Sequence, residues 1–263
     1  MIDLDILTPA FIAGLLILVL HVPLGREVLR RGIIFLDLAV AQVAALGALF
    51  AEVLGMGDQH WVVQLGAGLA ALAAVFFLHW VERHWRDAQE AVIGSVFVLA
   101  ASAAVLVLSH DAHAGERIAH LLSGQILWVE WPHIAWVAAL YALLLLVRWR
   151  FPALRHGFGF YLVFALAVTA SVQLVGVYLV FASLIVPALA VRRRQQGRAG
   201  LWRAYAIGAL GYAAGLLASA WWDLPSGAAI VWALALVALC STLLPWPGSE
   251  RDETSSVLAS LDR

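Results

Sequence analysis

The sequence predicts an all-α membrane protein with about eight or nine transmembrane helices. Of its 263 residues, 63% are hydrophobic and only 13% are charged, and the mean hydropathy is +0.91. A soluble domain carries about 25% charged residues, so this composition lies far outside the soluble range. The chain contains a series of apolar runs of roughly 20 residues, the length that a helix needs to cross the hydrocarbon core. Many of the 12 tryptophans stand near the ends of these runs, where indole rings settle at the headgroup level.

The first apolar run, near 6–24, is expected to remain as a span. The opening residues MIDLDIL are acidic, whereas a cleavable signal peptide begins with positive charge. We predict a single transmembrane domain over 1–245, followed by a polar cytoplasmic tail at 246–263. The other straightforward spans are expected near 33–55, 61–81, 90–109, 133–151, 201–222 and 226–244.

The apolar tract at 159–191 is too long for one span. At 1.5 Å per residue, a straight helix of that length would exceed the bilayer thickness by about half. Arginines flank the tract at both ends, so it has to cross an even number of times. We predict a break between Ser171 and Gly176, where Ser171 and Gln173 interrupt the apolar pattern, with a longer helix out and a shorter helix back. Irregular backbone at membrane depth needs protein or water around it, which predicts a cavity beside the break.

Arginines are concentrated in alternate loops, and this asymmetry predicts the topology. Positively charged loops stay in the cytoplasm, so the loops after the first, third and fifth spans and after the long tract are predicted to be cytoplasmic. The other loops carry acids, histidines and a single arginine, Arg117, and are predicted to lie outside together with the N-terminus. The C-terminus is then cytoplasmic. The arginines that set this orientation are Arg26, Arg30, Arg31, Arg83, Arg86, Arg148, Arg150, Arg155, Arg192, Arg193 and Arg194.

One late span carries a face of small residues. Gly211, Gly215 and Ser219 recur every four residues, so they lie on one side of a helix. Small side chains let membrane helices approach closely. This pattern predicts helix packing, and we assign it no chemistry.

Residue types exclude several functions. All 16 basic residues are arginines, and a phosphate-binding loop of the Walker type requires a lysine. The chain therefore cannot itself be a P-loop ATPase, and it cannot form a lysine Schiff base. The single cysteine, Cys240, can form neither an internal disulfide nor a thiolate metal cluster.

Three segments together resemble a known family. Arg30–Ala48 reads RRGIIFLDLAVAQVAALGA, Glu90–Leu108 reads EAVIGSVFVLAASAAVLVL and is followed by HLLSGQILWV, and Val175–Arg193 reads V-G-x-x-L-V-F-A-S-L-I-V-P-A-L-A-V-R-R. In order and spacing the chain resembles, over about residues 10–245, the zinc and manganese type permeases of bacterial ABC importers. The resemblance implies an ABC importer permease fold of the metal-uptake type, located in the bacterial inner membrane.

The resemblance also implies partners. In such importers two permease copies form the pathway, separate cytoplasmic ATPases hydrolyse ATP, and an extracytoplasmic binding protein delivers the ion. The chain would then be a transport subunit and not an enzyme, with zinc, manganese or iron as cargo, no bound cofactor of its own and no nucleic-acid partner. A short surface helix at about 191–201 would dock on the ATPase, with Pro187 permitting the bend and Arg192, Arg193 and Arg194 holding it at the cytoplasmic surface.

Asp37 lies within the second predicted span, where an ionised carboxylate costs about 2.5–3.5 kcal/mol on insertion scales. By resemblance it corresponds to an aspartate of the translocation pathway and is a candidate metal ligand; a structural partner for a nearby arginine is the alternative. The family usually places a histidine one turn later, where this chain has Ala41 beside Gln42. Gln42 offers only a neutral oxygen, so a weak, transient site is favoured. Ser171 and Gln173 complete the predicted pathway residues.

The predicted outer loop holds a second group of possible ligands. His113, Glu116 and His120 are candidate metal ligands, because nitrogen and carboxylate groups bind divalent ions and a helix would place Glu116 and His120 on one face. A solvated loop and a contact surface for the binding protein are the alternatives.

Two other classes of protein compete with an ABC permease. A secondary transporter is expected to show inverted repeats and several buried charges, but no repeat is evident and Asp37 is the only charge deep in a span. An intramembrane hydrolase would use Ser95 or Ser123 as its nucleophile and needs a base within reach. No histidine follows His156, so the late spans cannot supply an imidazole base.

Overall fold

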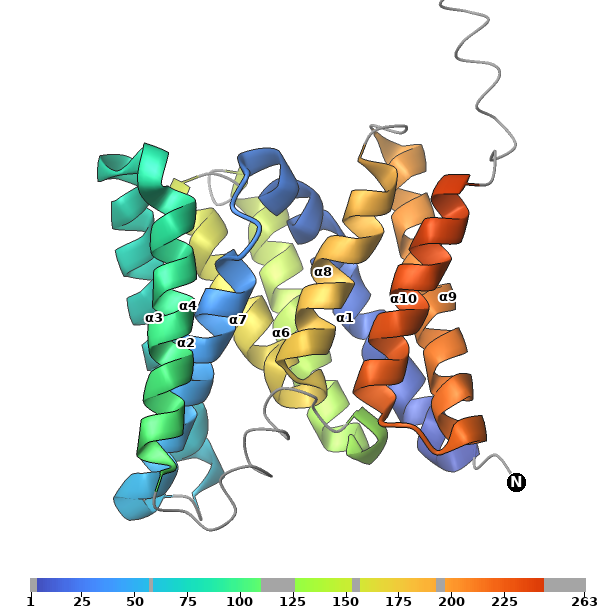
Figure 1. Ribbon diagram of the computed structural model, residues 1–263, viewed down its shortest axis with the longest axis horizontal. Coiled ribbons are helices and arrows are strands. Elements are labelled where there is room, and N and C mark those ends of the chain that lie inside the picture. Colours follow the sequence, from blue (N-terminus) through green and yellow to red (C-terminus); the bar gives the residue numbers. More distant parts are fainter. Residues whose placement is uncertain (1–3, 57–58, 110–125, 153–156, 193–196, 244–263) are drawn as a thin grey trace, which may run out of the picture.

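The computed structural model describes residues 4–56, 59–109, 126–152, 157–192 and 197–243. In these residues the chain forms a bundle of α-helices with no strand (Figure 1). Eight of the helices are long and apolar enough to cross a membrane, and a shorter apolar helix accompanies them. The all-α, polytopic prediction is confirmed. The α-helices are α1 (Leu4–Arg31), α2 (Leu36–Ala51), α3 (His60–His84), α4 (Gln89–Val107), α6 (Trp131–Arg150), α7 (Gly157–Val175), α8 (Val177–Val191), α9 (Arg198–Trp222) and α10 (Ser226–Leu243).

The first two helices differ most from their predicted bounds. α1 extends to Arg31 because Glu27, one turn earlier, pairs with Arg30 at 2.7 Å and with Arg31 at 2.8 Å and so supports a polar last turn. Gly32 then takes a positive φ of 76°, which ends the helix and delays the start of α2. A short π-helical turn, Glu52–Met56, follows α2, and Gly55 within it has a φ of 80°.

Successive helices run in opposite directions, so the loops gather at two ends of the bundle. The last turns of α1, α3, α6 and α8, which precede the arginine-rich loops, lie at the upper end in Figure 1, and so does the end of α10. The N-terminus lies at the lower end (Figure 1). The alternation of arginine-rich and arginine-poor loops along the sequence therefore corresponds to the two ends of the structure.

The long apolar tract forms the two helices α7 and α8, which confirms an even number of crossings. The break falls at Gly176, with a φ of 80° and a ψ of 165°, a backbone conformation that only glycine adopts readily. Ser171 and Gln173 remain within α7, so these polar residues do not themselves interrupt the helix. The returning helix α8 has 15 residues, about 22 Å at 1.5 Å each, which is shorter than the hydrocarbon core.

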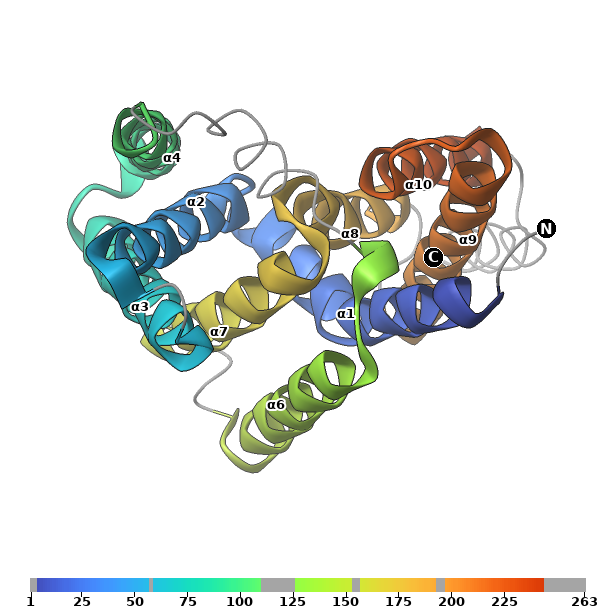
Figure 2. The ribbon, with the colours of Figure 1, turned by 90° about the horizontal axis from the view of Figure 1, so that it is seen from below.

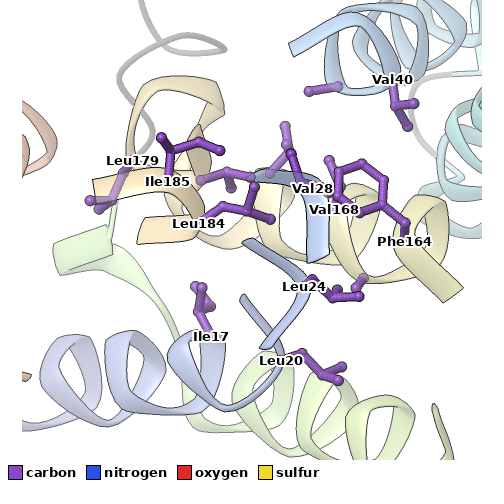
Figure 3. Packing of buried hydrophobic residues seen from close by; sticks show 14 of the residues in the cluster. Ile17, Leu20, Leu24, Val28, Val40, Phe164, Val168, Leu179, Leu184 and Ile185 are labelled. Atoms are coloured by element: carbon purple, nitrogen blue, oxygen red, sulfur yellow. The ribbon is translucent and has the colours of Figure 1, made fainter. Parts of the chain in front are cut away.

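The helices α1, α7 and α8 form the centre of the bundle, and α3, α4, α6, α9 and α10 surround them (Figure 2). Buried aliphatic side chains from the three central helices meet in one cluster, with Ile17 and Leu24 from α1, Val168 from α7 and Leu184 from α8 (Figure 3). α1 and α8 cross so closely that a Cβ atom added at Gly25 would collide with the backbone carbonyl of Leu184.

The face of small residues on α9 packs as predicted. A Cβ added at Gly211 would collide with Leu234 of α10, and one added at Gly215 would collide with Ile230. Ser219 is buried beside them and donates a hydrogen bond to the carbonyl of Leu224 at 2.7 Å. The pattern therefore serves the α9–α10 contact.

The predicted docking segment at 191–201 is only partly described. Val191 is the last residue of α8, Arg192 follows in a turn, and Arg198 to Leu201 already belong to α9. Pro187 is buried inside α8, and the helix continues for four residues beyond it. Arg193 and Arg194 lie outside the described residues, as does the tail at 246–263.

Candidate functional site

Asp37, the predicted pathway residue on α2, is a buried acid. It lies in the first turn of α2 and is 1% exposed. Neither carboxylate oxygen is bonded to another side chain in the described part of the chain. The alternative of an arginine partner therefore finds no support among the described residues. The carboxylate lies in the first turn of α2, at the N-terminal end of the helix, where the helix dipole favours a negative charge.

Asp37 heads a narrow helix face. Ala41, Ala44 and Ala45 follow it at spacings of four, seven and eight residues, and all three are buried. Gln42 is 7% exposed, but five residues of α-helix turn it about 140° away from Asp37. The structure therefore does not place the Gln42 amide on the side of α2 that carries the carboxylate.

Ser171 is fully buried and belongs to a hydrogen-bond network that links three helices. Its Oγ donates to the carbonyl of Ala167 and accepts from the Tyr141 hydroxyl, each at 2.5 Å, and it lies 2.9 Å from His21 Nε2. With the serine proton committed to Ala167, His21 is assigned the tautomer in which Nε2 donates. His21 comes from α1, Tyr141 from α6 and Ser171 from α7, so this network joins three helices. The pathway role of Ser171 stays a prediction.

A second tyrosine–serine pair connects α8 and α9 in the same manner. Ser183 Oγ donates to the carbonyl of Leu179 at 2.6 Å and lies 2.7 Å from the Tyr212 hydroxyl. All of these groups are buried. His21, Tyr141 and Tyr212 were not predicted as buried polar groups from the sequence. The available signal for His21 was a histidine in the middle of an otherwise apolar run.

Replacing Ser171 with alanine is expected to lower the free energy of unfolding by about 1–3 kcal/mol, because the buried donors of His21 and Tyr141 lose their common acceptor. Thermal unfolding of the purified chain in nanodiscs measures the change. Ser102 is the matched control: its hydroxyl bonds only the carbonyl of Leu99 and it is exposed, so Ser102→Ala should change stability by less than about 0.5 kcal/mol. Equal effects of the two substitutions would contradict the network's structural role.

Gln173 has a different environment from Ser171. It lines a cavity of about 850 Å³ between α3, α6 and α7, here called the α3–α6–α7 cavity. Leu174, two residues before the backbone break, also lines it, which confirms the predicted cavity beside the break. Thr169 and His133 add polar atoms to a lining that is otherwise largely apolar.

At the arginine-rich end, an ion pair joins α1 to α3 and a cation–π contact joins α1 to α7. Arg31 lies 3.9 Å from Glu82 of α3, and its guanidinium stacks 4.0 Å from the centre of the Phe160 ring of α7. His79 lies 3.1 Å from the same Glu82. These contacts fix the ends of the three helices relative to one another.

The last residue before α9 is also held from α1. Arg26 Nη1 donates a hydrogen bond to the carbonyl of Gly197 at 3.2 Å, and Gly197 has a φ of 104°. Arg192 is exposed on the other side of the short segment that includes Arg193 and Arg194. α1 therefore contacts the segment that the sequence predicts to bind an ATPase.

The other predicted metal ligands stay predictions. His113, Glu116 and His120 lie outside the described residues. Within the described ranges, no group of three or more His, Cys, Asp or Glu side chains could hold a metal ion. Any site at Asp37 thus has few ligands from a single chain.

Ser95, a nucleophile candidate for a hydrolase, uses its hydroxyl in a hydrogen bond within its own helix. Its hydroxyl donates to the carbonyl of Ala91 at 2.8 Å, and the side chain is exposed on α4. Ser123 lies outside the described residues. The described part of the chain therefore gives no support to a hydrolytic site.

The fold and the buried aspartate define a polytopic, helical membrane transport protein. The chain belongs to the ABC 3 transport family, whose sequence profile matches residues 3–154 and 150–244. It is similar to the manganese transport system membrane protein MntC of Halalkalibacterium halodurans, with 24% identity over 246 residues that cover 86% of this chain and 82% of that protein.

Solved structures share the fold. The PsaBC structure from Streptococcus pneumoniae in complex with Fab matches with a TM-score of 0.70 and 18% identity, over 95% of both chains. An inward-facing structure of a putative metal-chelate type ABC transporter matches with a TM-score of 0.56 and 13% identity, over 97% of this chain and 83% of that one. The arrangement of helices is therefore that of ABC transporter membrane subunits.

Proposed function

We propose that this chain is the permease subunit of an ATP-driven importer for a divalent metal ion, zinc, manganese or iron. Membership of the ABC 3 transport family supports the transport role, and the manganese transport protein among its relatives supports the cargo. The observation that carries the proposal is Asp37, a carboxylate that is 1% exposed and has no side-chain partner among the described residues. A buried charge of this kind inside a membrane protein indicates an ion pathway.

The chemistry at Asp37 favours passage over capture. A single carboxylate supplies hard oxygen ligands, which suit manganese and other divalent ions. Ala41 occupies the position one turn later and supplies no ligand, so the ion is held weakly and can leave again. In a homodimer of permease chains, a second Asp37 would join the first along the pathway.

The orientation follows from the arginines. The upper end in Figure 1, where the arginine-rich loops begin, is assigned to the cytoplasm, and the N-terminus is assigned to the outside of a bacterial inner membrane. Two ATPase subunits would dock at the cytoplasmic end and supply the ATP hydrolysis that a chain without lysine cannot perform with a P-loop of its own. A metal-binding protein would deliver the ion at the opposite end, near the loop that contains His113, Glu116 and His120.

The docking segment can be tested by charge removal. Replacing Arg192, Arg193 and Arg194 together with alanine is expected to reduce copurification of the ATPase subunit at least tenfold, because three cationic contacts to the partner are lost. Replacing Arg83 and Arg86, exposed arginines at the same end of the bundle, serves as the control and should leave the complex intact. An undiminished complex in the triple variant would contradict the docking role.

The cargo can be tested in proteoliposomes that contain the complete importer. Radioactive zinc, manganese and iron are offered separately, and each is then challenged with an excess of the other two. We expect saturable uptake of at least one of the three ions and competition among them. Failure of all three ions to enter would overturn the assignment of the cargo.

A further inference from the structure

The α3–α6–α7 cavity contains Gln173, a predicted pathway residue, but none of its lining residues belongs to α2, the helix that carries Asp37. Its volume of about 850 Å³ is within the range of roughly 300–1,000 Å³ found for small-molecule sites. Most of its lining is aliphatic or aromatic, with Leu65 from α3, Val137 and Leu140 from α6, and Leu166 from α7. An apolar cavity of this size is suited to hydrocarbon.

The residues that line the cavity place it in one half of the membrane. They come from the first turns of α3 and α6 and from the last turns of α7, which is the same end of the bundle as the N-terminus. Seven residues of helix separate Trp61 from Gly68, about 10 Å in depth, which fits within one leaflet of a hydrocarbon core of roughly 30 Å.

The cavity is open to the surroundings of the bundle. Trp61, Leu65 and Trp136 line it and are 64%, 54% and 57% exposed. In Figure 2, α6 stands at the edge of the bundle, and α7 lies between α3 and α6. Since these helices are membrane spans, the molecules that reach such an opening are lipids. Exposed tryptophans at its rim fit the level of the headgroups.

One residue that lines the cavity carries a buried polar atom without a partner among the described residues. Thr169 is only 9% exposed, and its Oγ1 has no hydrogen-bond partner among the described residues. Hydroxyls in helices commonly bond the carbonyl four residues earlier, as those of Ser171 and Ser183 do here. Buried hydroxyls are otherwise almost always bonded, so the free Thr169 hydroxyl points to an acceptor supplied by a ligand.

We propose that the α3–α6–α7 cavity is a binding site for a phospholipid of the leaflet on the N-terminal side. An acyl chain fills the apolar part, and an ester carbonyl accepts a hydrogen bond from Thr169. The side chains of Gln173 and His133 are further polar groups for the glycerol and headgroup region. Because Gln173 and Leu174 directly precede the break at Gly176, the bound lipid supports α7 at the point where the chain turns back.

Native mass spectrometry of the full-length chain in complex with its partners tests the proposal, with palmitoyl-oleoyl phosphatidylglycerol and phosphatidylethanolamine as the titrated lipids. Gly68→Leu fills the cavity, because a Cβ at Gly68 meets no atom within 4 Å and the side chain can therefore enter the open space. Gly94→Leu is the matched control: Gly94 also lies within a spanning helix and its Cβ would meet nothing within 4 Å, but it does not line the cavity.

The wild type and Gly94→Leu are expected to retain one phospholipid per chain after delipidation, and Gly68→Leu is expected to retain none. Thr169→Val keeps the size of the side chain and should raise the half-saturating lipid concentration about fivefold, which corresponds to one net hydrogen bond. Size-exclusion profiles confirm that each variant is folded. Equal lipid retention in all variants would overturn the proposal. A wild-type complex that retains no lipid, with a membrane helix of another protein in the cavity instead, would overturn it as well.

Discussion

Replacing Asp37 with asparagine is expected to reduce metal uptake at least tenfold while leaving the amount of assembled importer unchanged. Asparagine has nearly the same size but no charge, so the pathway loses its buried anionic ligand while the packing of α2 is preserved. Removing the acid also removes the cost of burying a charge, so the stability of the chain should not fall. Accumulation of radioactive manganese or zinc in cells that depend on this importer measures the effect.

Glu52→Gln provides the control for the Asp37 substitution. Glu52 is also acidic and follows the same helix, but its side chain is exposed. The control substitution should therefore leave uptake within about twofold of the wild type. Normal uptake by Asp37→Asn would remove Asp37 from the pathway and leave a structural role as the explanation for its burial.

Gly25→Ala is expected to cause the largest loss of stability, about 2–3 kcal/mol. The added methyl group would occupy the position of the Leu184 backbone carbonyl, and a backbone group cannot move aside as a flexible side chain can. α1 and α8 would have to separate at the centre of the bundle, where Leu24 and Leu184 belong to the same buried cluster (Figure 3). Thermal unfolding in nanodiscs gives the change in stability, and size-exclusion chromatography gives the folded yield.

Gly68→Ala isolates the effect of helix propensity from that of packing. It introduces the same methyl group into a spanning helix, but no atom lies within 4 Å of the new Cβ. Its effect should therefore be neutral or slightly stabilising, since alanine favours the helical state more than glycine does. A Gly25→Ala variant as stable as Gly68→Ala would show that α1 and α8 do not cross in this way.

Hydropathy was enough to predict most of the fold. The spans at 61–81, 90–109 and 133–151 correspond to α3, α4 and α6 within a few residues, because lipid imposes a minimum length on each apolar run. α1 was underestimated, since its last turn is polar and is stabilised by ion pairs that a hydropathy reading treats as a loop. The positions of the helix ends depend on such local contacts and on glycine conformations.

The break in the long tract was placed correctly, but its cause was not. Ser171 appeared to interrupt the apolar pattern, yet its hydroxyl is satisfied within α7 and by two other helices. Gly176 ends the helix through its positive φ. The sequence shows that a residue is polar, but it does not show which neighbours satisfy it, and for this reason Ser171 and Gln173 could not be assigned to their different environments.

The candidate site was predicted in part. A carboxylate in a span is conspicuous, and Asp37 is indeed buried without a side-chain partner among the described residues. Five residues of helix place Gln42 and Asp37 on different sides of α2, so the pathway role of Gln42 stays a prediction. His21 and Tyr141 were missed because their partners are distant in the sequence, and only the folded bundle brings them to Ser171.

The most direct test of an ATP-driven importer is metal accumulation in proteoliposomes that contain the permease, its ATPase partner and the binding protein. The account predicts metal accumulation only when ATP is present on the side of the membrane where the ATPase lies. Without ATP, no metal should accumulate even when a proton gradient is imposed. The Asp37→Asn variant should not accumulate metal. Accumulation that proceeds without ATP and follows the proton gradient would contradict the account and identify a secondary transporter.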